Sequence, residues 1–234
     1  MPESIFREDM TVKLVQQMGD DSSVAMAARV STGGDTSPTD VSKDAGLINY
    51  LMRDRHGSPF EHNAFTFYIE APIFVFREFM RHRIASYNEE SGRYKELSPV
   101  FYVPDNSRSL IQVGKPGAYT FVAGTPEQIE IAQAGISLAS EESYAMYQDL
   151  LDKGIAREVA RMLLPVNIYS SMYVTMNARS LMNFLSLRVT AVGSAYPSFP
   201  QREIEMVAEL MEGIFAEKMP QTYAAFIKNG RVAP

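Results

Sequence analysis

Hydrophobic and polar residues alternate in two stretches of the chain. In residues 64–71, Phe65, Phe67 and Ile69 fall on one side, with a polar or aromatic residue between them. Residues 166–176 alternate in the same way. A period of two is typical of a strand with one buried face. The pattern therefore predicts two half-buried β-strands.

Apolar residues recur at helical spacing in most other segments. The predicted helices cover residues 20–31, 40–56, 72–84, 125–153, 154–164, 177–188, a segment after residue 201, and 223–228. Their expected N-caps are Asp21 or Ser22, Thr125, Asn177 and Ser198, with capping boxes at Thr125 and Ser198. In the 154–164 helix, we expect the apolar residues Ile155, Val159, Met162 and Leu163 to face the core.

Residues 104–124 contain glycine and proline and show no period, so a long mobile loop is predicted there. Few strands separated by helices of unequal length fit the α+β class. The 234 residues suffice for one well-buried core and are short for two. A single domain over residues 1–234 is therefore expected.

Composition excludes several function classes. A net charge of −6 disfavours broad binding to nucleic acid or acidic membranes, which needs a basic face. The longest strongly apolar run, residues 71–76, is too short to cross a bilayer. The acidic N-terminus has no apolar signal segment, so a cytoplasmic location is expected. With no cysteine and three irregularly spaced histidines, no disulfide, cysteine nucleophile or metal site is predicted.

The densest polar stretch runs from Arg81 to Tyr94 and is predicted to begin on a helix end and continue as a loop. It contains three arginines, a histidine, two serines, an asparagine and two glutamates. Guanidinium groups are favoured where planar anions are bound through two hydrogen bonds. Complementing a helix dipole would account for Arg81 and Arg83 but not for the polar residues that follow. The stretch predicts an anion site, most simply for nucleotide phosphates.

Other constellations have simpler interpretations. Ser86 could be a nucleophile with His82 as base, but no third group is evident to orient the histidine. Glu158 and Arg161 lie three apart on a predicted helix and are expected to form a weak exposed ion pair. No glycine-rich phosphate loop of the usual patterns occurs.

The whole stretch matches RHRxxSxNExSxRY and resembles the signature of the flavin-dependent thymidylate synthases. Further matches lie at residues 56–62, 157–161, 164–165, 177–185 and 187–188. The resemblance covers roughly residues 12 to 228. It implies that family's α+β fold, a small and mainly antiparallel sheet flanked by helices, several of them long.

The resemblance also implies a reaction. Family members methylate dUMP to dTMP with 5,10-methylenetetrahydrofolate as carbon donor, FAD as hydride carrier and NADPH as reductant. The missing cysteine agrees with this family, because the unrelated synthases attack uracil with a thiolate. Activation must then be electrostatic. By resemblance, the catalytic guanidinium at the O2/N3 edge of the uracil is that of Arg188.

The resemblance assigns further residues. The implied FAD contacts are Ser58, Arg81, His82, Arg83, Glu89, Asn177, Ala178, Arg179 and Asn183. The implied dUMP contacts are Glu78, Arg81, Glu89, Glu90, Ser91, Gly92, Arg93, Arg161 and Arg188. Ser91 is expected to bind and not to attack. A homotetramer with sites shared between subunits is also implied.

The chain departs from the family pattern at three places. Glu78 stands where some members carry glutamine, and the segment after Arg188 lacks a histidine that some members have, with Tyr196 as a possible aromatic substitute. Residues 104–124 also align poorly with the family. Two other functions are alternatives. A flavin- or nucleotide-binding regulator would have kept the pocket without the chemistry, and an RNA-binding module is disfavoured by the acidic net charge.

Overall fold

The computed structural model describes residues 3–33, 41–115 and 118–234, and the chain divides into two compact units. Unit 1 comprises residues 1–9, 71–76 and 90–170, and unit 2 comprises residues 10–70, 77–89 and 171–234. The chain therefore passes between the units several times. The single domain over residues 1–234 stays a prediction.

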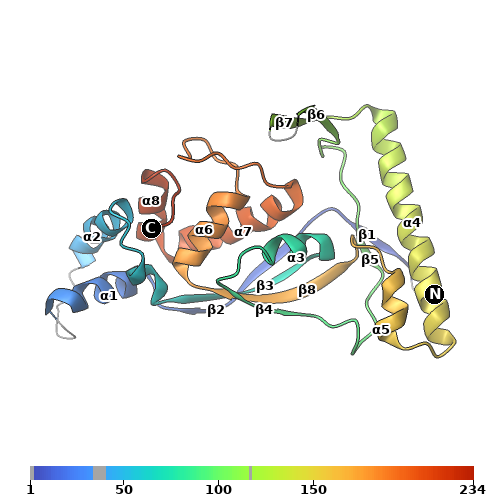
Figure 1. Cartoon of the computed structure of the whole chain (residues 1–234), viewed down its shortest axis with the longest axis horizontal. Helices are drawn as coiled ribbons and strands as arrows, with labels where there is room; N and C mark the ends of the chain where they lie inside the picture. Colours follow the sequence, from blue (N-terminus) through green and yellow to red (C-terminus); the bar gives the residue numbers. More distant parts are fainter. Residues whose placement is uncertain (1–2, 34–40, 116–117) are drawn as a thin grey trace. The chain divides into compact units, whose positions relative to one another are not determined.

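The main sheet has four strands in the order β2-β3-β8-β4 (Figure 1). Their bounds are β2 Thr11–Met18, β3 Ala64–Pro72, β8 Tyr169–Met176 and β4 Ser86–Glu89. β2 pairs antiparallel with β3, and β4 pairs antiparallel with β8. The two strands predicted from alternation are β3 and β8, and both are confirmed.

Contacts on the polar face of β3 and β8 fix how these strands lie. The hydroxyls of Thr66 and Thr175 are 2.9 Å apart. The rings of Tyr68 and Tyr173 meet edge to face at 6.0 Å. Moving two residues forward on β3 thus moves two residues back on β8, so the strands run in opposite directions. The opposite face carries Phe65 and its neighbours, which are fully buried.

The helices of unit 2 pack against one another and, through α7, against the sheet. They are α1 Asp21–Gly33, α2 Val41–Arg53, α6 Ala178–Arg188, α7 Arg202–Lys218 and α8 Pro220–Lys228, with the short η2 at Ser58–Glu61. Helix α6 packs against α7, and α7 against β2 (Figure 1). Two aromatic contacts add to this packing: Phe65 of β3 meets Phe215 of α7 edge to face at 5.9 Å, and Phe79 at the end of α3 stacks on Phe184 of α6 at 4.8 Å. Helix α3, Ile73–Phe79, leads from β3 toward β4.

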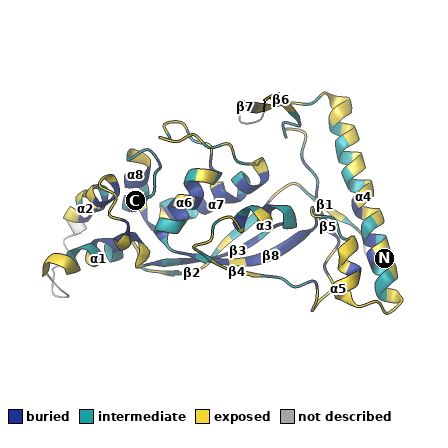
Figure 2. Cartoon of the chain, viewed as in Figure 1, coloured by how far each residue is buried: buried dark blue, intermediate teal, exposed yellow. Residues whose placement is uncertain are grey.

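Unit 1 is built around the long helix α4, Pro126–Asp152. Its other elements are β1 Ile5–Arg7, which pairs parallel with β5 Val100–Tyr102, the hairpin of β6 Ile111–Lys115 and β7 Ala118–Val122, and the short helices α5 Arg157–Ala160 and η3 Arg161–Leu163. The buried core is Leu97, Phe101, Tyr144, Tyr147, Ala160 and Ile168. Most of α4 outside this contact is exposed (Figure 2).

The predicted capping residues have mixed outcomes. The capping box of Thr125 and Gln128 is present, and Asn177 caps α6. The prediction for the first helix is wrong, because the carboxylate of Asp20 accepts from the N–H groups of Ser22 and Ser23. Asp21 is buried instead and accepts from the first N–H groups of α8.

The capping box at Ser198 is also wrong. The hydroxyl of Ser198 donates to the carbonyl of Val189 at 2.9 Å, and α7 begins after Gln201 without a side-chain cap. The segment between α6 and α7 is thus tied back onto the end of α6.

Three predicted segments differ from the structure. Residues 104–124 contain the β6–β7 hairpin where a loop was expected. The helix predicted for residues 72–84 ends at Phe79, and residues 86–89 form the edge strand β4 because β8 offers them a hydrogen-bonding partner. In residues 154–164 the helix is only one short turn, so its predicted inward residues are exposed, Met162 by 78%.

No helix within residues 3–33, 41–115 and 118–234 has the length and apolar character needed to cross a bilayer.

Candidate active site

The predicted site residues divide between the two units at the middle of the signature. Unit 2 holds Ser58, Glu78, Arg81, His82, Arg83, Glu89, Asn177, Ala178, Arg179, Asn183 and Arg188. Unit 1 holds Glu90, Ser91, Gly92, Arg93 and Arg161. The signature therefore supplies residues to two structural environments.

Arg188 is the last residue of α6. Its guanidinium contacts Glu78 in the last turn of α3 and His82 just beyond that helix. Its Nη1 lies 2.7 Å from Oε2 of Glu78, and its Nε donates to Nε2 of His82 at 3.1 Å. The Arg188 side chain is 16% exposed and that of Glu78 34%. Two signature-region residues and the predicted catalytic arginine, far apart in sequence, are thus in direct contact.

His82 is held on several sides. Its ring meets Phe184 edge to face at 4.9 Å, and its carbonyl accepts from the hydroxyl of Tyr87 at 2.5 Å. Burial and the nearby charge of Arg188 lower the pKa of His82 from 6.5 to about 4. The imidazole is therefore neutral near pH 7. Since Nε2 accepts a hydrogen bond, the ring proton lies on Nδ1.

Tyr87 was not predicted as a site residue. It occupies a variable position of the signature, but burial raises its pKa to about 12. Its hydroxyl also lies 2.9 Å from the carbonyl of Phe79. From β4, the Tyr87 hydroxyl therefore holds the carbonyl at the end of α3 and the carbonyl of His82, and so stabilises the turn between α3 and β4. The weak pairing of Ser86 with His82 finds no support, since Nε2 of that histidine faces Arg188.

Arg179 lies near the start of α6 and against η2. Its Nε donates to the carbonyl of Pro234 at 2.6 Å, and its Nη1 pairs with Glu61 at 2.5 Å. A Cβ on Gly57 would come within 2.6 Å of the guanidinium carbon. Glycine is thus required for this close approach. Ser58, exposed, follows directly.

The other predicted FAD contacts on α6 lie along its first two turns. The Asn177 side chain caps the helix by accepting from Ser180 N–H at 2.9 Å. Ala178 is fully buried, and its N–H donates to Oδ1 of Asn63 at 2.7 Å. Asn183 is exposed, one turn beyond Arg179. Asn63, which was not predicted, therefore fixes the entry into the helix.

Arg81 and Arg83 flank His82 and are both exposed. Within the described residues, neither guanidinium makes an ion pair or a hydrogen bond. Two unpaired guanidiniums on one turn are suited to an anion with several oxygens. Glu89, at the end of β4, is half-buried.

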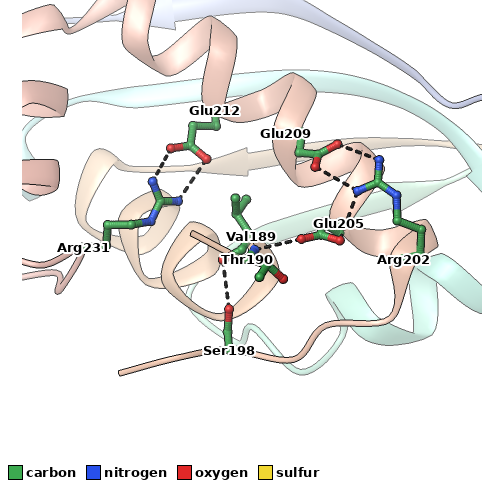
Figure 3. Close-up of polar contacts among 8 residues, drawn as sticks. All are labelled: Val189, Thr190, Ser198, Arg202, Glu205, Glu209, Glu212 and Arg231. Carbon is green, nitrogen blue, oxygen red and sulfur yellow. Dashed lines mark hydrogen bonds and ion pairs between the residues drawn. The ribbon is translucent and has the colours of Figure 1, made fainter. Parts of the chain in front are cut away.

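A polar network behind Arg188 holds the end of its helix (Figure 3). The N–H of Thr190, the second residue after the helix, donates to the Glu205 carboxylate at 2.8 Å. Glu205 in turn pairs with Arg202 at 3.0 Å. Nearby, Glu212 and Arg231 form a buried bidentate pair. The backbone that presents Arg188 is thus anchored to α7.

In unit 1, the second half of the signature packs beside α5 and η3. Gly92 is buried, and a Cβ there would lie 3.4 Å from Cδ of Arg161. The Nε of Arg93 lies 3.1 Å from Oε2 of Glu158, and both side chains are more than half exposed. The predicted pairing of Glu158 with Arg161 is wrong, because Arg93 takes the carboxylate.

The turn itself is ordered by local bonds. Ser91 accepts from the N–H groups of Tyr94 and Lys95 through its carbonyl, and from that of Arg93 through its hydroxyl. Glu90 forms an ion pair with Lys95. Within the described ranges, no group of three or more histidine, aspartate and glutamate side chains could hold a metal ion.

Comparison with known proteins decides the family. A family model described as "Thymidylate synthase complementing protein" matches residues 13–221. A flavin-dependent thymidylate synthase from Streptomyces coelicolor is 60% identical over 100% of this chain and 97% of its own length. The chain belongs to the flavin-dependent thymidylate synthase family. The family expected from the signature is confirmed.

Two further matches support this membership. A flavin-dependent thymidylate synthase from Thermotoga neapolitana is 48% identical over 93% of this chain and 90% of its own length. The crystal structure of PolB, a UMP/dUMP methylase from Streptomyces cacaoi bound with 5-Br UMP, is 52% identical with a TM-score of 0.93, and each chain covers 100% of the other. The predicted α+β fold of this family is therefore confirmed too.

Proposed function

We propose that this chain is a flavin-dependent thymidylate synthase that methylates dUMP to dTMP. The full-length identity of 60% to a synthase of that name carries the proposal. The chain uses 5,10-methylenetetrahydrofolate as carbon donor, FAD as hydride carrier and NADPH as reductant. It contains no cysteine, so the uracil is activated without a thiolate nucleophile.

The residues of unit 2 suit an anionic flavin nucleotide. Arg81 and Arg83 expose guanidiniums that have no partner within the described residues. The ring proton of His82 lies on Nδ1, the nitrogen that does not contact Arg188. With Ser58, Glu89 and the start of α6 (Asn177, Ala178, Arg179 and Asn183), they would hold FAD. When bound, reduced FAD supplies the hydride for the nucleotide.

Arg188 is the proposed catalytic residue. Its guanidinium is always charged, and it lies in a largely desolvated position where electrostatic interactions are stronger than in water. Placed at the O2/N3 edge of the uracil, it stabilises negative charge that develops on the ring. Glu78 pairs with it, and Arg81 belongs to the same unit.

The turn in unit 1 is the proposed nucleotide cradle. Arg93 and Arg161 present guanidiniums, and the buried Gly92 lets the backbone approach closely. Glu90 and Ser91 complete the turn, with Ser91 in a binding role because no base activates its hydroxyl. Arginine is the side chain best shaped for phosphate.

We also propose that the chain forms a homotetramer with sites shared between subunits, and that it acts in the cytoplasm, where its nucleotide substrates occur. Large apolar side chains are exposed in unit 1, and they support self-association. They include Ile131, Leu138 and Met146 on α4, and Met162 and Val166 after α5.

The proposed activity is tested with purified protein. We expect a yellow preparation whose visible absorbance is bleached by NADPH and recovers when dUMP and methylenetetrahydrofolate are added, with dTMP as product. A flavin- or nucleotide-binding regulator would bind dUMP without forming dTMP. UMP is offered in parallel because PolB is named a UMP/dUMP methylase. Product from UMP alone would redirect the substrate assignment.

A further inference from the structure

The proposed chemistry does not explain why Glu78 and His82 both contact the Arg188 guanidinium, an arrangement that we call the bracket. Glu78 lies in the last turn of α3 and His82 lies three residues beyond the end of that helix, and both contact the same guanidinium from α6. Arg188 follows them by more than a hundred positions in the sequence. This convergence is therefore a property of the fold and not of local helix geometry.

The contacts constrain the guanidinium on all three nitrogens. Nε donates to His82 at 3.1 Å, Nη1 pairs with the Glu78 carboxylate at 2.7 Å, and Nη2 lies 3.5 Å from the Glu78 carbonyl. A guanidinium has five N–H groups in one plane. One N–H on each Nη therefore stays available for a substrate, and the plane in which it points is set by Glu78 and His82.

The supports of this bracket are themselves rigid. Phe184 lies between the ring of Phe79, on which it stacks at 4.8 Å, and the edge of the His82 ring. Tyr87 binds the His82 carbonyl from β4. Because Phe184 packs on the His82 ring and Tyr87 holds the His82 backbone, Nε2 of His82 is a fixed acceptor that restricts the rotamers of Arg188.

A direct contact of Glu78 with the nucleotide is harder to explain. A carboxylate repels phosphate and also the negative charge that develops on the uracil. In the structure its Oε2 faces Arg188 and partly neutralises that residue. Pairing with the arginine is thus the favourable use of this charge.

We propose that Glu78 and His82 are positioning residues that fix the plane of the Arg188 guanidinium, an inference that rests on the proposed role of Arg188. Glu78 acts through its charge and one hydrogen bond, and His82 acts as the acceptor for Nε. Neither needs to touch the uracil for this role.

The first test uses matched variants of the flavin-loaded enzyme. His82→Gln keeps an acceptor near the Nε2 position, whereas His82→Phe keeps a ring against Phe184 and removes the acceptor. We expect His82→Phe to lower kcat by about 10-fold to 100-fold, the cost of misplacing a reacting group. His82→Gln should recover most of that loss. Because Nδ1 of His82 is also a proposed FAD contact, kcat is compared at saturating FAD, and flavin content is measured in both variants from visible absorbance.

Glu78→Leu should behave like His82→Phe, and Glu78→Gln should fall between it and the unchanged enzyme. Glu217→Gln is the control, because Glu217 pairs with Lys218 at the end of α7 in the same unit, away from Arg188. The double variant His82→Phe/Arg188→Ala should be no slower than Arg188→Ala alone, since positioning has no value without the positioned group. Losses that add in the double variant, or a kcat restored by excess FAD, would overturn the proposal.

A second measurement does not depend on turnover. The imidazole titration of His82 is followed by NMR and assigned by its absence in His82→Gln. Arg188→Ala should raise the pKa of His82, because it removes a neighbouring positive charge. An unchanged titration would refute the contact even if the enzyme is active. Conversely, a shifted titration in a protein that forms no dTMP would support the bracket while the proposed activity fails.

Discussion

The two units hold their site arginines in opposite ways. In unit 2, Arg188 pairs with Glu78 at side-chain exposures of 16% and 34%. In unit 1, Arg93 pairs with Glu158 at exposures of 54% and 55%. Desolvation strengthens the first interaction, and water and salt weaken the second. The comparison indicates that unit 2 orients a charge precisely, whereas unit 1 keeps a charge ready to change partners.

The largest expected effect is the removal of the oriented charge. Arg188→Ala should lower dTMP formation by about 100-fold or more, as loss of a preorganised electrostatic group does. Arg188→Lys should restore little, because an ammonium lacks the planar fork that Glu78 and His82 hold. Product is measured by chromatography and flavin content by absorbance. Turnover close to that of the unchanged enzyme in Arg188→Ala would remove the catalytic role.

Two glycines offer a smaller, matched test of rigidity. A Cβ on Gly57 would lie 2.6 Å from the Arg179 guanidinium and 2.8 Å from the Pro234 carbonyl. Gly57→Ala should therefore lower the free energy of unfolding by about 1–3 kcal/mol, as overpacking does, or displace Arg179. Chemical denaturation measures the first outcome and flavin content the second.

Gly92→Ala in unit 1 is the companion variant. Its Cβ would lie 3.3 Å from Cδ1 of Leu97 and 3.4 Å from Cδ of Arg161, which are ends of flexible side chains. We expect a stability loss below about 1 kcal/mol. A loss as large as that of Gly57→Ala would mean that unit 1 is as rigid as unit 2 and would contradict the comparison.

The sequence could predict the parts that depend on local pattern. The alternation in β3 buries Phe65, Phe67 and Ile69, and the capping box of Thr125 opens α4. The four-residue strand β4 could not be predicted in this way, because its hydrogen bonds come from β8, far away in the sequence. Nor could the cap of α8, which is Asp21, two hundred residues earlier.

The candidate site shows the same limit. The family resemblance identified Glu78, His82 and Arg188 one by one, each with a ligand as its implied partner. That they contact one another follows from how α3 and α6 pack around Phe184, which no spacing in the sequence encodes. The exposed face of residues 155–163 was predicted as core because apolar spacing alone does not show whether a partner element exists.

The next prediction uses the low pKa of His82, about 4 against 6.5 when unperturbed. Between these pH values the unfolded chain binds a proton at this site that the folded chain does not, so stability falls as pH falls through the window. At about 1.4 kcal/mol per pKa unit, the whole difference between 6.5 and about 4 would give about 3.5 kcal/mol. Because His82 is partly solvated, we expect less, about 1–2 kcal/mol.

Denaturation curves across this pH range measure the effect. The groups that face His82 are Arg188 from α6, Glu78 on α3 and Tyr87 on β4. His82→Gln should retain stability better than the unchanged protein on acidification, since glutamine binds no proton. Parallel curves for the two proteins would show that the His82 environment is not desolvated.

The smallest expected effect distinguishes the two arginine pairs, because loss of the Glu158 carboxylate should improve dUMP binding whereas loss of the Glu78 carboxylate should impair turnover. Glu158→Gln removes an exposed carboxylate, and a pair of this kind contributes about 0.2–1 kcal/mol, so stability should change little. In the proposed cradle, Glu158 competes with the nucleotide phosphate for Arg93. Its removal should therefore lower KM for dUMP, by about twofold at low salt and less as salt screens the charges. Glu78→Gln, in contrast, should lower kcat. If both variants impaired turnover alike, Glu158 would be holding Arg93 as Glu78 holds Arg188, and the division of roles between the two units would fail.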